Sequence, residues 1–219
     1  MKIYHLSDTH GSGFWDNPLP SAIDAVVHTG DLFPNISRGI VSKEIDFQSA
    51  WISRFTEEIV RWLDGRPLVY VPGNHDYVEL AEFLPCHRAG TTPLDLLGKK
   101  WVGFREIPWI AGEWAGELRA PEMSKLVCDL FDHWSNLIIE EGSGILLSHS
   151  PPAGILDKDS YGAIHYGISA LSNALQYRSH NFAAVLFGHV HLPSFSQQRM
   201  LNILFSNAAD NPGGVLEIT

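Results

Sequence analysis

The sequence predicts an α/β fold in which two β-sheets are sandwiched between helix layers, within a single domain spanning residues 1–219. Two observations predict it. Five short apolar runs alternate with amphipathic helical patterns, and the last stretch is rich in short strands joined by turns. No repeat, low-complexity segment or linker divides the chain, and 219 residues can bury roughly 70% of their unfolded surface.

The five apolar runs are too short for helices, and several are rich in β-branched residues. Near-continuous apolar runs of this length are typical of strands that are buried on both faces of a sheet. They cover residues 2–7, 24–29, 67–71, 144–147 and 182–187. The tail is expected to add strands at 195–198, 200–206 and 215–218, with the run Asn211-Pro212-Gly213-Gly214 as a turn.

Apolar residues recur at spacings of three and four in two segments, which predicts amphipathic helices. The first covers residues 43–63 and ends before Gly65. The second covers residues 121–140 and begins with Pro121, which suits the first turn of a helix. A third helix is expected over residues 168–177.

Composition excludes several classes of protein. Lys and Arg number 15 against 25 Asp and Glu, so the net charge of −10 argues against a basic groove for long duplex nucleic acid. With only 2 Cys, any metal must be held by His and carboxylates rather than by four thiolates. We expect a cytoplasmic protein without a membrane partner, because signal-peptide features and apolar stretches of about 20 residues are absent from the sequence.

Each of the five buried strands is followed at once by polar side chains that can bind metals. These side chains are Asp8, His10, Asp31, Asn74, His149, His189 and His191, with His75 and Asp76 beside them. Because the carboxyl ends of parallel strands line a common crevice, we expect the side chains to meet there. They supply only oxygen and imidazole nitrogen, and they are too many for one ion. They suit two divalent ions that share a bridging carboxylate, Mn²⁺ first, with Fe²⁺ or Zn²⁺ as alternatives.

The order of these motifs resembles the signature of the calcineurin-like metallophosphoesterase superfamily. The motifs are Asp8-x-His10, Gly30-Asp31, Gly73-Asn74-His75-Asp76, His149 and Gly188-His189-x-His191. The resemblance implies a four-layer α/β/β/α sandwich with two mixed β-sheets. It also implies two metal sites that share Asp31 as a bridge. The first site would comprise Asp8, His10, Asp31 and His191, and the second Asp31, Asn74, His149 and His189.

By the same resemblance, His75 stabilises the transition state and protonates the leaving oxygen, and Asp76 fixes the turn rather than binding metal. Protein Ser/Thr phosphatases of the superfamily carry an Asp that orients this His, and Pro34 stands in its place here. A protein phosphatase is therefore not expected, and the means of orienting His75 stays an open question.

The run from His149 to Gly154, His-Ser-Pro-Pro-Ala-Gly, is similar to a motif of small metallophosphodiesterases. It favours a phosphodiesterase that hydrolyses nucleotide-like or other small phosphodiesters by in-line attack of a metal-bridging hydroxide. The alternatives are a phosphomonoesterase acting on small molecules and a non-catalytic metal-binding interaction scaffold.

A few aromatic residues and histidines lie outside these motifs. His165 follows the Pro-Pro loop and is a candidate substrate contact, with packing as the favoured alternative. Trp15, Trp109 and Trp114 lie in loop-like stretches, where surface packing is the favoured interpretation and stacking on a base is the alternative.

Overall fold

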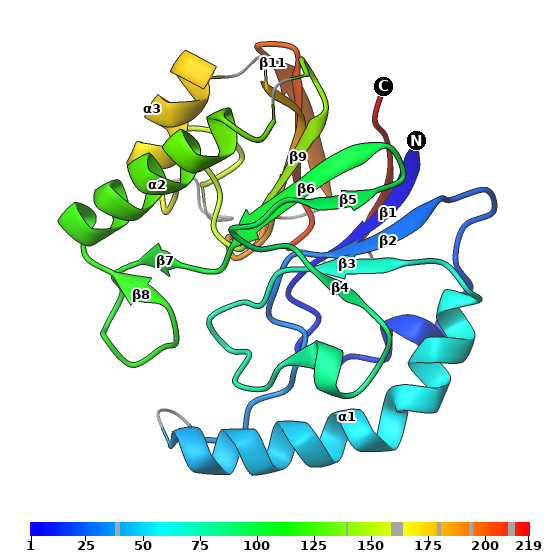
Figure 1. Ribbon diagram of the computed structural model, residues 1–219. Helices are drawn as coiled ribbons and strands as arrows, with labels where there is room; N and C mark the ends of the chain where they lie inside the picture. Colours follow the sequence, from blue (N-terminus) through cyan, green and yellow to red (C-terminus); the bar gives the residue numbers. More distant parts are fainter. Residues whose placement is uncertain (38–39, 139, 159–163, 179–180, 193–194, 210–212) are drawn as a thin grey trace.

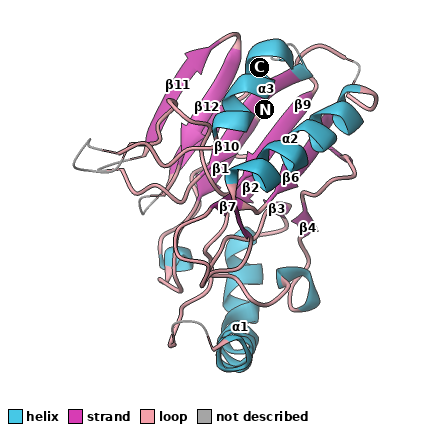
Figure 2. Cartoon of the chain, turned by 90° about the vertical axis from the view of Figure 1, so that its left-hand side faces the viewer, coloured by secondary structure: helices cyan, strands magenta, loops and turns pink. Residues whose placement is uncertain are grey.

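Two β-sheets pack face to face in the centre of the molecule, and helices cover their outer faces (Figure 1). Figure 2 places α2 and α3 beside the larger sheet and α1 at the other end of the molecule. This computed structural model describes residues 1–37, 40–138, 140–158, 164–178, 181–192, 195–209 and 213–219. The predicted α/β/β/α sandwich with two mixed sheets is confirmed.

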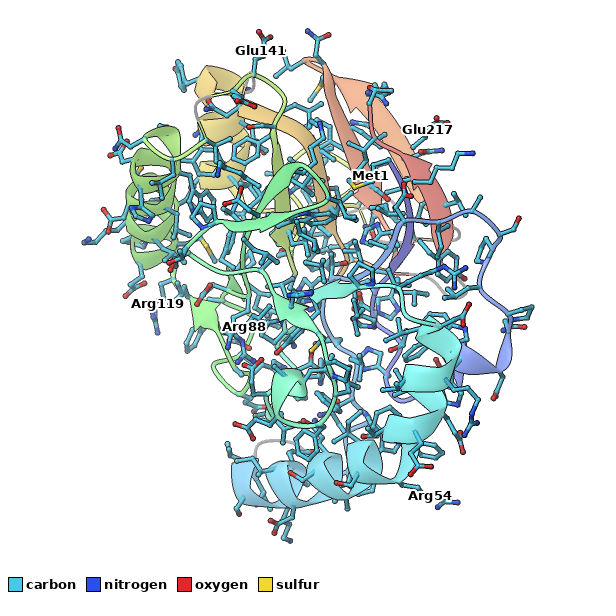
Figure 3. All side chains as sticks on the ribbon, turned by 45° about the vertical axis from the view of Figure 1, so that its right-hand side comes forward. Met1, Arg54, Arg88, Arg119, Glu141 and Glu217 are labelled. Carbon is cyan, nitrogen blue, oxygen red and sulfur yellow. The ribbon has the colours of Figure 1, made fainter. Side chains whose placement is uncertain are left out.

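The smaller sheet has the order β13-β1-β2-β3-β4. Its strands are β1 (Lys2–Leu6), β2 (Ala25–His28), β3 (Leu68–Tyr70), β4 (His87–Arg88) and β13 (Gly214–Glu217). β1 to β4 run parallel, and β13 pairs with β1 in the antiparallel sense, so Met1 and Glu217 lie at one edge (Figure 3). The outer face is covered by α1 (Val41–Leu63), whose Ile52, Ile59 and Leu63 pack into the core.

The larger sheet has the order β11-β12-β10-β9-β6-β5. Its strands are β5 (Leu94–Leu96), β6 (Lys99–Phe104), β9 (Gly144–Ser148), β10 (Phe182–Phe187), β11 (Ser196–Met200) and β12 (Ile203–Asn207). The four inner strands run parallel, and antiparallel β5 and β11 close the two edges. Helices α2 (Ala120–Ser135) and α3 (Ser169–Arg178) cover the outer face through Val127, Trp134 and Leu171.

An apolar layer from both sheets fills the space between them, with Val27 and Val69 on one side and Ile145 and Leu186 on the other. Strands β2, β3, β9 and β10 are buried along their whole length. Because each strand has one face on this layer and the other face under helices, its sequence is apolar along nearly its whole length, as the near-continuous apolar runs predict.

Two predicted boundaries differ from the structure by more than two residues. The second helix ends at Ser135 rather than 140, since the Trp134 carbonyl accepts from both Leu137 and Ile138 and the chain turns inward to bury Ile138. The strand expected over 200–206 begins at Ile203 instead, because Leu201 and Asn202 both take positive φ and form a two-residue hairpin turn between β11 and β12.

Several short elements are not predicted by the apolar pattern. In the middle of the chain they are β4, β5, β6, the parallel pair β7 (Ile107–Pro108) and β8 (Glu117–Leu118), and the 3-10 turn η2 (Leu80–Glu82). Near the N-terminus, the 3-10 turn η1 (Phe14–Asp16) is another. Among the helices in the described ranges, none combines the length and the apolarity needed to cross a membrane.

Candidate metal centre

The residues that follow β1, β2 and β3 of the smaller sheet meet those that follow β9 and β10 of the larger sheet. Hydrogen bonds join the loops of the two sheets directly, from His149 Nδ1 to the Thr29 carbonyl at 2.7 Å and from His189 N–H to Asp8 Oδ2 at 2.8 Å. The predicted crevice therefore lies where the two sheets meet, and each sheet supplies part of it.

Two buried carboxylates, Asp8 and Asp31, form its centre. Oδ2 of Asp8 accepts from Ser7 Oγ at 2.6 Å and from the His189 N–H at 2.8 Å, while Oδ1 lies 3.4 Å from His191 Nε2. Oδ1 of Asp31 accepts from the His75 N–H at 2.8 Å. Oδ2 of Asp31 faces three imidazoles, with Nε2 of His149 at 3.4 Å, His75 at 3.8 Å and His10 at 3.9 Å.

The side of the site nearer the larger sheet is built around His149. Its Nδ1 donates to the Thr29 carbonyl at 2.7 Å, so Nε2 is the nitrogen left to face the site. That Nε2 lies 2.9 Å from Asn74 Oδ1, and the ring of His189 lies 4.9 Å from the His149 ring.

The backbone at these positions is held in unusual conformations. Asp8, His10, Asp31 and His189 all have positive φ, between 46° and 65°. Non-glycine residues rarely adopt this region, and such strain is typical of functional sites. Gly30, at φ +102°, also passes so close to the ring of His149 that a Cβ would lie 2.4 Å from Nδ1.

The carboxylate of Asp76 connects two of the loops by hydrogen bonds. Its Oδ2 accepts from the N–H groups of Asp31 at 2.8 Å and Gly73 at 2.7 Å, and its Oδ1 accepts from Phe33 at 3.1 Å. Arg105, which the motif pattern did not indicate, donates to the carbonyls of Gly73 at 2.6 Å and Asp76 at 2.8 Å.

The charges of the site favour anionic carboxylates. Burial would raise the pKa of Asp31, but His149, His75 and His10 more than offset this and hold it well below its usual range. Burial would lower the pKa of His149, yet the carboxylate of Asp31 raises it to about 9. Burial beside His149 lowers the pKa of His189 to about 4.

The donor set fits metal ions. Asp8, His10 and His191 bring one ligand atom each to within 4.8 Å of one another, and so do Asp8, Asp31 and His149. Ligands that bind one ion at about 2.1 Å lie roughly 3 Å apart, close to the 2.9–3.4 Å separations around His149 and Asp8. Mixed imidazole and carboxylate donors suit Mn²⁺, Fe²⁺ or Zn²⁺.

Two further predicted residues are His75 and His165. The His75 ring contacts Trp114, with ring centroids 4.1 Å apart, and His10 at 5.2 Å. His165 is half exposed, and its Nδ1 lies 2.7 Å from an oxygen of buried Asp157. Residues 161–163, which precede His165 in the sequence, lie outside the described residues.

Trp15 and His5 lie outside the cluster and make contacts of their own. Trp15 packs with Trp51 and Phe55 against α1, as surface packing predicted. Buried His5 lies between Ser206 Oγ at 2.9 Å and Thr29 Oγ1 at 3.0 Å, so both ring nitrogens have partners outside the cluster.

Comparisons with known proteins agree with the fold and the motifs. The chain superposes on one solved structure with a TM-score of 0.69 at 13% identity, covering 94% of this chain and 89% of that one. A protein described as a 5′-nucleotidase from Staphylococcus aureus gives a TM-score of 0.50 at 10% identity, over 94% of this chain and 48% of its own. GAP50, described as the anchor in the inner membrane complex of Plasmodium, gives a TM-score of 0.52 at 14% identity, over 95% of this chain and 71% of its own.

These identities are low enough that the likenesses establish the fold alone. A search of the curated proteins returns no match. The sequence profile described as calcineurin-like phosphoesterase matches residues 1–193, which is most of the chain and includes every motif residue from Asp8 to His191. The chain therefore belongs to the calcineurin-like phosphoesterase family.

Proposed function

We propose that this phosphoesterase is a dinuclear-metal phosphodiesterase acting on nucleotide-like or other small phosphodiesters. The observation that carries the proposal is the position of Asp31, whose Oδ2 faces His149 on one side and His10 on the other. A carboxylate in this position can bridge two ions, the first held with Asp8, His10 and His191 and the second with Asn74, His149 and His189. We propose Mn²⁺ as the native metal.

When bound, two such ions would lower the pKa of a shared water and hold the phosphoryl oxygens for in-line displacement. The chain itself contributes the orientation of the donors. His149 is fixed by the Thr29 carbonyl, and Asp8 is fixed by Ser7 and the His189 N–H. Such outer hydrogen bonds set the tautomer and direction of metal ligands.

His75 is the residue proposed to handle the leaving group. Its Nε2 is on the Asp31 side of the ring, 3.8 Å from Oδ2, while its side chain keeps partial access to solvent. As the P–O bond to the leaving group breaks, the electron pair moves to that oxygen and a proton from Nε2 forms the new O–H bond. Positioned proton donors of this kind contribute roughly 10²–10⁴-fold in rate.

Charge explains why the substrate is expected to be small. The whole chain carries −10, which opposes long polyanions, whereas two divalent ions beside the Asp8 and Asp31 carboxylates leave the crevice locally positive. Attraction for a phosphodiester then depends on bound metal. His165, fixed by Asp157, is proposed as a contact to the rest of the substrate.

The alternatives are a phosphomonoesterase and a non-catalytic scaffold. A scaffold would not need a His between the carboxylate of Asp31 and Trp114, where the buried Nδ1 has no hydrogen-bond partner among the residues that the structure describes. A phosphodiester has two esterified oxygens on phosphorus and a phosphomonoester has one, and kinetics on the two kinds of ester distinguishes these activities.

The test compares bis-p-nitrophenyl phosphate with p-nitrophenyl phosphate, with added Mn²⁺ and with a chelator. We expect Mn²⁺-dependent hydrolysis with the higher kcat/KM on the diester, abolished by the chelator and by Asp31→Asn. Asp95→Asn, which changes an exposed carboxylate paired with Lys100, is the matched control. Faster hydrolysis of the monoester would establish the phosphomonoesterase, and no metal-dependent hydrolysis of either would establish the scaffold.

A further inference from the structure

An acidic side chain cannot orient the His75 ring from position 34, because that position holds Pro34, whose side chain offers no hydrogen-bond acceptor. Nδ1 of His75 is buried and finds no hydrogen-bond partner among the residues that the structure describes. The orientation of the ring must therefore come from packing and from its backbone.

Packing is supplied by Trp114. Its ring centroid lies 4.1 Å from that of His75 at an interplanar angle of 47°, which is the closest aromatic contact of the site. The edge of the His10 ring meets His75 from another direction, at 5.2 Å and 82°. Together the two contacts restrict rotation of the imidazole about its χ angles while leaving Nε2 on the Asp31 side.

The loop that carries Trp114, residues 109–116 between β7 and β8, is itself fixed to the site. The N–H of Ala115 donates to the carbonyl of Asn74 at 3.3 Å, one residue before His75. The Glu117 carboxylate accepts from the N–H groups of Ile110 at 3.2 Å and Ala111 at 3.1 Å, and Arg119 covers the ring of Trp109 at 4.5 Å. Figure 3 shows Arg119 at this edge of the molecule.

The backbone of His75 is held from the opposite side by α1. Fully buried Gln48 donates through Nε2 to the His75 carbonyl at 2.7 Å and accepts through Oε1 from the Tyr77 N–H at 2.8 Å. The His75 N–H donates to Asp31 at 2.8 Å. Both backbone polar groups of His75 are therefore satisfied, so that only the imidazole needs a further constraint.

We propose that Trp114 is a positioning residue for His75, which orients the imidazole by ring packing. This inference rests on the proposed function, in which His75 protonates the leaving oxygen. It assigns Trp114 to the orientation of the acid rather than to stacking on a substrate base.

The kinetic test uses leaving groups of different basicity. Diphenyl phosphate releases a more basic oxygen than bis-p-nitrophenyl phosphate and depends more on the acid. With Mn²⁺, Trp114→Ala should lower kcat on diphenyl phosphate roughly 10–100-fold, with a smaller loss on the nitrophenyl ester and an unchanged KM. Trp114→Phe should restore most of the rate. Tyr177→Ala removes an aromatic ring that is 82% exposed on α3, away from this loop, and should behave as wild type.

A second experiment measures proton NMR signals and requires neither bound metal nor catalytic turnover. In the metal-free protein, the Trp114 ring should shift the His75 Hε1 and Hδ2 proton signals, identified by their loss in His75→Ala. Trp114→Ala should remove that shift, while Tyr177→Ala should leave it. If Trp114→Ala raises KM on both esters with kcat intact, Trp114 binds substrate and the inference is wrong. Equal kcat in Trp114→Ala and wild type on diphenyl phosphate, or His75 signals without a Trp114 shift, would also overturn it.

These outcomes separate the inference from the proposed function. If the wild-type protein hydrolyses neither ester with Mn²⁺, the proposed function fails, and the proton signals still decide whether Trp114 orients the His75 ring. If the wild type is active and Trp114→Ala matches it, only the inference fails.

Discussion

Replacing Asp76 by Asn should loosen the two loops that carry Asp31 and Asn74. The carboxylate of Asp76 accepts three backbone N–H groups, two on Oδ2 and one on Oδ1. The Asn side chain keeps one acceptor oxygen, and this oxygen is expected to replace Oδ2 because two donors meet there. The new NH₂ group then faces the N–H of Phe33, so donor meets donor at a buried position.

The expected loss in the free energy of unfolding follows from that one lost hydrogen-bond acceptor. Leaving a buried N–H unsatisfied costs about 1–3 kcal/mol, so Asp76→Asn should lower the free energy of unfolding by roughly 2 kcal/mol. For a chain of 219 residues this lowers Tm by roughly 4–8 °C. The shift of both loops should also weaken Mn²⁺ binding by about 10–100-fold, as changes to residues behind metal ligands do.

The assay is thermal unfolding of the metal-free protein followed by a Mn²⁺ titration, with exposed Asp95→Asn as the control. The control should match wild type in both measurements. If Asp76→Asn has the wild-type Tm and the wild-type Mn²⁺ affinity, the three hydrogen bonds do not hold the loops and the reasoning is refuted.

Three further predictions follow from the site and its surroundings. His75→Ala should keep wild-type Mn²⁺ binding in a titration and lose most of the turnover; loss of metal would show that His75 is a ligand. Gly30→Ala should unfold at lower temperature because its Cβ would meet the His149 ring, whereas Gly90→Ala, with open space around it, should not; equal Tm values would contradict this. Burial lowers the pKa values of His5 and His28 to about 3. Because the unfolded chain then takes up these protons first, the contribution of both residues to stability is complete above pH 6.5 and is lost as the pH falls toward 3. The loss is at most about 1.4 kcal/mol per pH unit for each residue. Urea unfolding of the metal-free protein should show this loss between pH 7.5 and 5, and equal values would contradict it.

Much of the fold could be predicted because the inner strands are buried on both faces. Runs such as Phe182–Phe187 lie under helices on one side and against the other sheet on the other, so their sequence is apolar throughout. Edge strands lack that signal. β5 alternates between half-buried and exposed positions, and it pairs with β6 through a turn at Leu97 and Gly98, both with positive φ.

The sequence could locate the candidate metal donors because they follow strand ends in a fixed order, whereas it could not locate the residues that support them. Glu44 and Gln48 are one turn apart on α1, where charged and polar residues normally form a solvated face. The structure buries both, with Gln48 bonded to the His75 carbonyl 27 residues away. The contact of Trp114 with His75 depends on the path of the β7–β8 loop, which tertiary packing determines.

The central claim is that Asp31 joins two metal sites in one centre. The most direct measurement is a calorimetric Mn²⁺ titration of the metal-free protein and of Asp31→Asn. We predict two equivalents for the wild type, and a weakening of both binding events in the variant because each ion loses the shared carboxylate. A single equivalent for the wild type, or a variant that binds two ions with unchanged affinity, would contradict the account.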